Sequence, residues 1–200
     1  MAAAVLFMST SLDGFVTGPN DGPGNPLGDG GARLHEWILP EGGGDHRAAA
    51  TRLTGVNRQA FDEVMATGAV VTGRQTFEPA QGWGGDHHDG VPVYVLSRGP
   101  APDWAAGWPG VRYVDDLAFA MGEAKRAAGE REVLVHGARL AARAVREGLL
   151  DEIQVHVVPV LLGSGRSLFD TLGTGPHDLE RVRVLEGEEG VTHLRYRLRR

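Results

Sequence analysis

The feature of this sequence that most limits its fold is a regular alternation of apolar, strand-like runs with helix-like segments. The final two strand-like runs, 180–186 and 191–198, instead follow each other across a glycine-containing turn. This order predicts an α/β fold of three layers, with a mainly parallel central sheet and an antiparallel C-terminal hairpin. The earlier strand-like runs are 3–9, 69–72, 91–96, 111–114, 132–135 and 152–160, and the helix-like segments are 33–39, 56–66, 117–128 and 138–147.

Several helix limits are visible in the sequence. Asp116 is a typical N-cap residue, and Gly129 is a typical helix-ending residue twelve or so positions later. Gly148 is placed to end the following helix in the same way. A further helix is expected to begin near Thr76, with Pro79 in its first turn, where the missing N–H group of proline is tolerated.

Length and composition favour one ordinary globular domain spanning residues 1–200. The chain has 200 residues, of which 42% are hydrophobic, and a formal net charge of −6. An acidic chain repels phosphate backbones, so no nucleic acid partner is expected. The absence of cysteine excludes disulfides and thiolate metal sites. No apolar stretch approaches the roughly 20 residues of a membrane span, and no signal peptide is apparent, so a cytoplasmic location without membrane contact is expected.

A glycine- and proline-rich segment, 14–44, follows the first strand-like run. Such a composition resists packing into regular structure, and long loops of this kind inside a compact domain are usually functional or disordered. Two interpretations stay open: a lid or substrate loop, and an insertion that the fold merely tolerates.

Nucleotide-binding signals occur at strand ends rather than in a standard fingerprint. The G-x-G-x-x-G pattern is absent after the first strand, and neither a P-loop nor the G-x-S-x-G hydrolase motif is present. Three other strand ends carry glycine, hydroxyl or arginine residues suited to phosphate, namely Gly73-Arg74, Ser97-Arg98 and Gly137-Ala138-Arg139. Three such ends in one sheet favour a long, multiply charged cofactor over the alternative of ordinary solvated turns.

Five motifs, in their order along the chain, resemble those of the dihydrofolate-reductase-like family. The resemblance covers nearly the whole chain, and its last motif is closer to the reductase domain of the bifunctional riboflavin-biosynthesis deaminase/reductase than to true folate reductases. It implies an NADPH-dependent oxidoreductase that transfers hydride to a small pterin- or aminouracil-like heterocyclic substrate. The motifs are Ser11-Leu-Asp-Gly14-Phe15, Gly73-Arg-Gln-Thr76-Phe-Glu78, Val95-Leu-Ser-Arg98, Gly148-Leu-Leu-Asp-Glu152 and Pro159-Val-Leu-Leu-Gly163-Ser-Gly-Arg166-Ser-Leu-Phe169.

The resemblance also implies which residues bind the phosphates of NADPH. The family's Gly-Arg-x-Thr turn, which holds the cofactor phosphates, corresponds to Gly73, Arg74 and Thr76. Its Leu-Ser-Arg segment, beside the adenosine 2′-phosphate, corresponds to Ser97 and Arg98. Two arginines at this end fit NADPH better than NADH, because a 2′-phosphate needs a charged partner.

The nicotinamide end is implied in the same way, with one departure from the family. The family usually has Gly-Gly at the turn under the nicotinamide, whereas this chain has His136 before Gly137, so we expect His136 either to crowd the cofactor or to alter the peptide geometry. The remaining implied positions are Ala138 and Arg139 in that turn, and Thr10, Asp13 and Gly14 in the loop that covers the nicotinamide.

A true dihydrofolate reductase is not expected, because the carboxylate that binds the pterin has no counterpart. Matching Trp37 to the family's tryptophan puts Leu34 at the acidic position. The proton donor is therefore open among Asp13, His136 and Glu36, in falling order. Each also has a structural interpretation, as a turn residue, a packed histidine and a solvent-facing carboxylate respectively.

Several other interpretations follow from the residues. Asp86-His87-His88-Asp89 is interpreted as a solvated loop rather than a metal site, because adjacent side chains rarely converge on one ion, and no metal is expected. His156, among valines, is interpreted as a packed core or interface histidine. The apolar run 153–162 and the C-terminal hairpin could supply a sheet edge, so a homodimer through them is one expectation from the sequence.

Two functions of other classes stay open beside the reductase. One is an NADPH-binding module without turnover, such as a sensor or a structural dimer, which the missing Gly-Gly and the missing carboxylate favour. The other is a heterocycle-binding protein independent of NADPH, in which Arg74 and Arg98 could be replaced without effect on any ligand.

Overall fold

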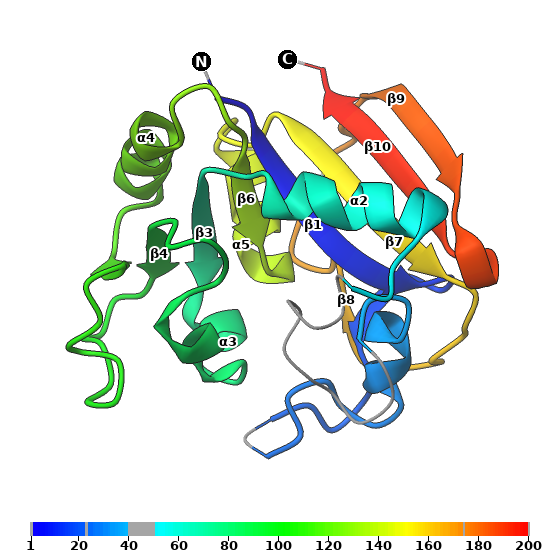
Figure 1. Cartoon of the computed structure of the whole chain (residues 1–200), viewed down its shortest axis with the longest axis horizontal. Coiled ribbons are helices and arrows are strands. Elements are labelled where there is room, and N and C mark those ends of the chain that lie inside the picture. Colours follow the sequence, from blue (N-terminus) through cyan, green and yellow to red (C-terminus); the bar gives the residue numbers. More distant parts are fainter. Residues whose placement is uncertain (1, 23, 40–50, 174, 200) are drawn as a thin grey trace.

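An eight-stranded sheet runs through the centre of the computed structural model, which describes residues 2–22, 24–39, 51–173 and 175–199 (Figure 1). The strand order is β5-β4-β3-β6-β1-β7-β10-β9. The strands from β5 to β7 are parallel, and β10 is antiparallel to both β7 and β9, as the sequence predicts. The strands are β1 (Ala4–Ser11), β3 (Ala69–Gly73), β4 (Val93–Leu96), β5 (Val111–Val114), β6 (Val133–His136), β7 (Glu152–Val158), β9 (Leu179–Glu186) and β10 (Thr192–Leu198).

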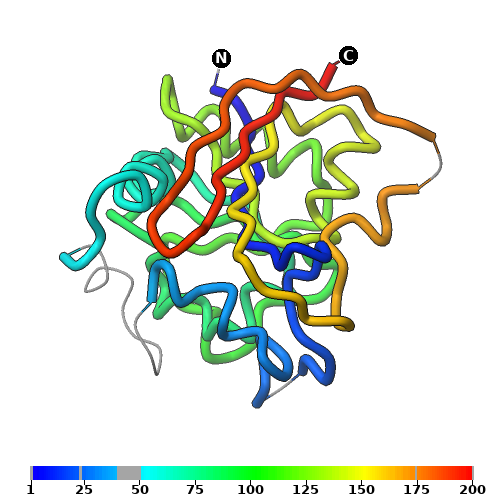
Figure 2. Tube along the Cα trace, turned by 90° about the vertical axis from the view of Figure 1, so that its right-hand side faces the viewer, coloured from blue at the N-terminus to red at the C-terminus, as the bar shows by residue number. Residues whose placement is uncertain are grey.

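Helices cover both faces of this sheet, which gives the expected three layers. Helices α4 (Leu117–Ala128) and α5 (Ala138–Arg146) pack on one face through alanine- and leucine-rich stripes that join the largest core cluster. Helix α2 (Gly55–Met65) lies across the other face, on the opposite side from α5 (Figure 2). The Asp116 side chain accepts a 2.6 Å hydrogen bond from the backbone N–H of Phe119, so the predicted N-cap of α4 is confirmed.

Short elements connect these layers near the carboxyl ends of the strands. The 3₁₀ helix η1 (Gly31–His35) replaces the longer helix expected over 33–39. Strand β2 (Phe15–Thr17) pairs with β8 (Arg166–Ser167), a ribbon too short for any periodicity to reveal. The predicted loop segment 14–44 therefore contains regular structure, and its part from 40 to 44 lies outside the described residues.

The helix expected at Thr76 is shorter than predicted and begins earlier. Helix α3 (Arg74–Phe77) starts immediately after β3, and Pro79 follows its end instead of opening it. An ion pair of 2.6 Å joins Arg74 Nε and Glu78 Oε1 across one turn, which favours the early start. The 3₁₀ helix η2 (Gln81–Gly85) comes next.

The N-terminus of α2 is capped by a residue from the other end of the chain. Glu188, in η3 (Glu188–Gly190) between β9 and β10, accepts hydrogen bonds from the backbone N–H groups of Val56 and Asn57 at 3.1 and 2.9 Å. A carboxylate at this end of a helix also interacts favourably with the helix dipole. The C-terminal hairpin thus fixes the start of a helix that precedes it by about 130 residues.

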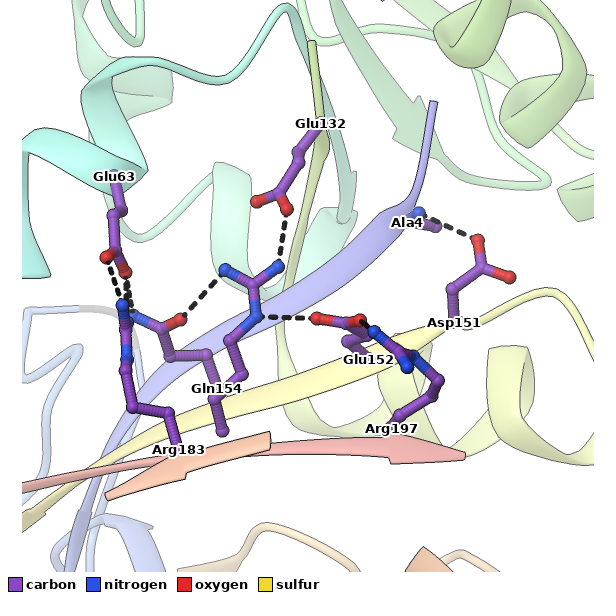
Figure 3. Close-up of polar contacts among 9 residues, drawn as sticks. Ala4, Glu63, Glu132, Asp151, Glu152, Gln154, Arg183 and Arg197 are labelled. Carbon is purple, nitrogen blue, oxygen red and sulfur yellow. Dashed lines mark hydrogen bonds and ion pairs between the residues drawn. The ribbon is translucent and has the colours of Figure 1, made fainter. Parts of the chain in front are cut away.

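A network of ion pairs lies on the α2 face of the sheet (Figure 3). Glu152 and Gln154 occupy alternate positions of β7, and Arg195 on β10 contacts both of them as well as Glu132. Arg183 on β9 forms two hydrogen bonds with Glu63 of α2, at 2.7 and 2.6 Å. The network ties α2 to the hairpin.

Among the described residues, no helix has both the length and the apolar character that crossing a membrane requires.

Candidate functional site

Adjoining cavities lie at the carboxyl ends of β1, β3 and β6, the edge where ligands of open α/β sheets bind. One cavity of about 250 Å³, called here the arginine-lined cavity, is lined mainly by residues that follow β3 and β6, and four of its lining residues are arginines. A second cavity of about 290 Å³, the middle cavity, shares Gln75, Thr76 and Gly137 with the first and extends toward His136. A third cavity of about 250 Å³, the inner cavity, continues past His136 between the sheet and α2.

The arginine-lined cavity has the character of an anion site. Helix α5 begins at its wall, and the N-cap residue Gly137 provides no side chain for the free N–H groups of the first turn. Arginines 74, 139, 143 and 166 line the same cavity. Helix terminus and guanidinium groups together produce the positive potential that phosphate oxygens prefer.

The structure places the two predicted phosphate turns against each other. A Cβ atom on Gly137 would lie 2.5 Å from Thr76 Oγ1, and the backbone there has a φ of 112°. Only glycine allows both this conformation and this approach. Gly73 and Ala138 complete the same wall.

Ser97 and Arg98, the residues predicted beside the 2′-phosphate, lie in different surroundings. Arg74 Nη1 lies 3.5 Å from Ser97 Oγ and 3.4 Å from the carbonyl oxygen of Pro100, so Arg74 and Ser97 do lie together. Arg98 is exposed and is not among the residues that line the arginine-lined cavity. Arg139 Nη1 donates a 2.8 Å hydrogen bond to Gln75 Oε1 at the opposite wall.

Arg166 reaches the site through the short β2–β8 ribbon. Its backbone N–H donates to Thr17 Oγ1 at 3.2 Å, and its guanidinium forms an ion pair with Asp21. Arg166 also lines both the arginine-lined cavity and the middle cavity. From the sequence, residues 163–166 have two open interpretations, a site for a substrate phosphate and a structural turn, and the two-residue strand β8 leaves no pattern that reveals it.

His136 stands at the junction of the middle and inner cavities. Its Nδ1 lies 3.0 Å from the carbonyl oxygen of Phe7, which can only accept, so Nδ1 carries the proton and Nε2 presents a lone pair. Burial, aided by the nearby His35, lowers the pKa of His136 to about 4. His136 is therefore a neutral hydrogen-bond acceptor at pH 7 rather than a proton donor.

The inner cavity is apolar and aromatic. Trp83 lines it with a left-handed φ of 52°, a conformation that a bulky residue rarely adopts. Its indole contacts the His87 ring at a centroid distance of 4.6 Å and His136 at 6.1 Å. Sequence reasoning missed Trp83, although its position among Gly82, Gly84 and Gly85 was the available signal of an unusual backbone.

The first-strand loop lies apart from these cavities. Thr10 is buried within β1, and Gly14 adopts a left-handed turn. Asp13 accepts hydrogen bonds from the backbone N–H groups of Leu162 and Gly163, at 3.2 and 2.7 Å. A hydrogen bond from the Ser11 hydroxyl, with these backbone bonds, lowers the pKa of Asp13. The structure therefore gives Asp13 the role of an ionised group that fixes a turn.

Glu36 is also separated from His136. It forms a 2.9 Å ion pair with Arg33, and both side chains are largely exposed. Glu36 lines another hollow, beside Trp37 and Asn57. Of the three candidate proton donors, His136 alone borders the cavities that connect to the arginines.

The interpretation of 86–89 as a solvated loop is wrong for its histidines. His87 and His88 are 9% and 0% exposed, and their Nδ1 atoms lie 2.7 Å apart. His88 Nε2 lies 3.1 Å from the carbonyl oxygen of Thr67. These contacts offset the loss of solvation. Among the described residues, no group of three histidine or carboxylate side chains is placed to hold a metal ion.

Solved structures share the fold at low sequence identity. A protein from Shewanella sp. PV-4 whose name places it in riboflavin biosynthesis is 23% identical, with a TM-score of 0.67, over 99% of both chains. RibD from Acinetobacter baumannii is 18% identical, with a TM-score of 0.63, over 100% of this chain and 59% of that one. A pyrimidine reductase-like protein from Corynebacterium diphtheriae is 12% identical, with a TM-score of 0.63, over 100% and 92%.

No curated protein matches the sequence. The family model for the RibD C-terminal domain, in contrast, matches residues 3–192. This match confirms the resemblance carried by the five motifs, and the fold neighbours agree with it. The chain belongs to the RibD C-terminal domain family.

Proposed function

We propose that the protein is an NADPH-dependent reductase that transfers hydride to a pterin- or aminouracil-like heterocycle. A reductase-like role is what membership of the RibD C-terminal domain family supports. The observation that carries the finer proposal is the continuity of an arginine-lined helix terminus with an aromatic cavity through Thr76 and Gly137. A dinucleotide needs both environments, one for its phosphates and one for its reactive ring.

The residues present fit such a cofactor. The open N-terminus of α5, with Arg74 and Arg139 on either side, suits a pyrophosphate, and Ser97 beside Arg74 suits the 2′-phosphate. Bound NADPH would supply the hydride. The chain's own residues would position the reactants: Thr76 and Gly137 lie where the arginine-lined and middle cavities meet, and Trp83 and His136 form part of the wall shared by the middle and inner cavities.

The proposal is tested by titrating the protein with NADPH and NADH and following reduced-nicotinamide fluorescence. We expect tighter binding of NADPH, and we expect the double variant Arg74→Ala, Arg98→Ala to bind NADPH at least about tenfold more weakly, because charged hydrogen bonds to phosphate are lost. Arg33→Ala is the matched control, since Arg33 lies on the surface in a pair with Glu36.

The outcomes separate the rival functions. Absence of binding by either nucleotide would refute the reductase. NADPH binding without oxidation across a panel of pterins and aminouracils would instead favour a binding module without turnover, the alternative that His136 before Gly137 supports. A single domain over 1–200, a cytoplasmic location and a homodimer carry over from the sequence as parts of the same proposal.

A further inference from the structure

A pair of buried histidines, His156 and His193, lies outside the arginine-lined cavity, and His156 borders the inner cavity. His156 on β7 lies directly opposite His193 on β10, and their Nδ1 atoms are 2.7 Å apart. The two side chains are 3% and 1% exposed. His193 Nε2 lies 2.9 Å from Asn57 Oδ1, on α2. His156 lines the inner cavity together with His136.

The hydrogen bonds determine which nitrogen of His156 carries the proton. Asn57 Nδ2 donates to the carbonyl oxygen of Glu188 at 3.4 Å, so Asn57 Oδ1 is the atom that accepts from His193 Nε2. Burial lowers the pKa of both His156 and His193, so both rings are neutral. A neutral His193 with its proton on Nε2 accepts at Nδ1, and the donor there is His156 Nδ1.

Four histidines line the inner cavity, and two of them, His156 and His136, therefore present the same kind of atom. The Nδ1 proton of His156 is used by His193, and that of His136 by the carbonyl oxygen of Phe7. Each ring keeps a lone pair on Nε2, for which the described residues provide no partner. The described lining of this cavity includes no carboxylate, lysine or arginine, and burial lowers the pKa of its residues His35, His136 and His156, so these three rings are neutral.

We propose that His156 and His136 are specificity-determining residues that select a neutral, planar ring able to donate N–H groups to both Nε2 atoms. His193 and Asn57 are positioning residues, which hold His156 in the accepting tautomer. The inference rests on the proposed function in that the selected ring belongs to the substrate. Trp83, at the same cavity, provides an aromatic surface beside that ring.

Binding of 5,6-diaminouracil to the NADPH-loaded protein, measured by calorimetry, tests the selection. The two ring N–H groups are the donors selected, so we expect binding by this ring and at least about tenfold weaker binding by 5,6-diamino-1,3-dimethyluracil, in which methyl groups block both of them and only the exocyclic amino groups remain. The variant His156→Phe should bind about tenfold more weakly, since one buried hydrogen bond is lost. Met65→Leu, which changes the same wall without removing an acceptor, should bind normally. Equal binding of the two uracils, or no binding, would overturn the proposal.

The tautomers are measured directly by ¹⁵N NMR of the imidazoles, without any substrate. We expect a proton on Nδ1 of His136 and His156. Asn57→Asp should charge His193, reverse the bond between the histidines and move the His156 proton to Nε2, with at least about tenfold weaker diaminouracil binding. A proton on Nε2 of His156 in the unaltered protein would overturn the proposal. The NMR measurement needs no NADPH, so failure of the cofactor proposal in the NADPH titration is distinguished from failure of this one.

Discussion

Three structural requirements meet at Gly137 and restrict this position to glycine. Its φ of 112° is open to glycine, its missing Cβ admits Thr76 Oγ1, and it starts the helix that faces the arginine-lined cavity. The family's preceding glycine is here His136, whose side chain is directed to Phe7 by a 3.0 Å hydrogen bond. The turn therefore keeps one strict glycine while its neighbour contributes a polar atom to the cavity.

Replacing Gly137 by alanine should destabilise the protein more than replacing a glycine that also has a positive φ but has free space around its Cβ position. We expect Gly137→Ala to lower the free energy of unfolding by about 2–4 kcal/mol, combining left-handed strain with overpacking against Thr76. Gly148→Ala is the control, because Gly148 has a φ of 65° and a Cβ atom added there would meet none of the described residues within 4 Å. Urea unfolding of both variants measures the difference; equal losses would contradict the close approach.

At the scale of elements, β7 carries two different polar systems on one face. Glu152 and Gln154 belong to the ion network, and His156, two residues further, belongs to the histidine pair. The opposing positions on β10 are Arg197, Arg195 and His193 in register. Burial of Glu63 would raise its pKa, but hydrogen bonds from Arg183 and Gln154 and nearby positive charge outweigh this and lower it.

Removing Arg195 from this network should leave its carboxylates with less compensation, since Glu152 would keep only its ion pair with Arg197. We expect Arg195→Met to lower the free energy of unfolding by about 3 kcal/mol, because Glu132 and Glu152 both lose an ion pair and the Arg195 side chain is only 14% exposed. Arg33→Ala, at an exposed pair, should cost less than about 1 kcal/mol. Denaturant melts of the two variants compare them, and similar small losses would show that the network is not energetically buried.

Acid should destabilise the whole molecule through its buried histidines. A histidine whose folded pKa is depressed binds fewer protons than in the unfolded chain, so the free energy of unfolding falls as pH falls from about 6.5 toward the folded value. His136, with a pKa of about 4, contributes up to roughly 3 kcal/mol over that window, and His35, His156 and His193 act in the same direction.

The pH dependence of urea unfolding between pH 7 and 4.5 measures this contribution. His136→Gln should give a shallower dependence than the unaltered protein, while His177→Gln, at an exposed position, should leave it unchanged. Paired carboxylates such as Glu63 lose their contribution only at lower pH, because their pKa is lowered. An unchanged slope in His136→Gln would show that this ring titrates normally.

The sequence predicts the molecule better at the level of layers than at the level of contacts. Apolar runs such as β3 and β6 are buried on both faces, so their positions are plain from composition, and the α4 cap is a local signal. The β2–β8 ribbon and the left-handed backbone of Trp83 depend on distant partners. For the same reason, motifs identify Arg74 and Gly137, while the pairing of His156 with His193 requires knowing which strands are neighbours.

The cap that Glu188 places on α2 has a consequence for how the chain matures. The bonds from Val56 and Asn57 span 132 and 131 positions, so a chain emerging from the ribosome has made α2 long before its capping carboxylate exists. The wall of the inner cavity therefore cannot be completed during synthesis of the first half. Nascent chains released before residue 188 should be recognised by quality-control proteases as unfinished, even though most of the sheet is already present.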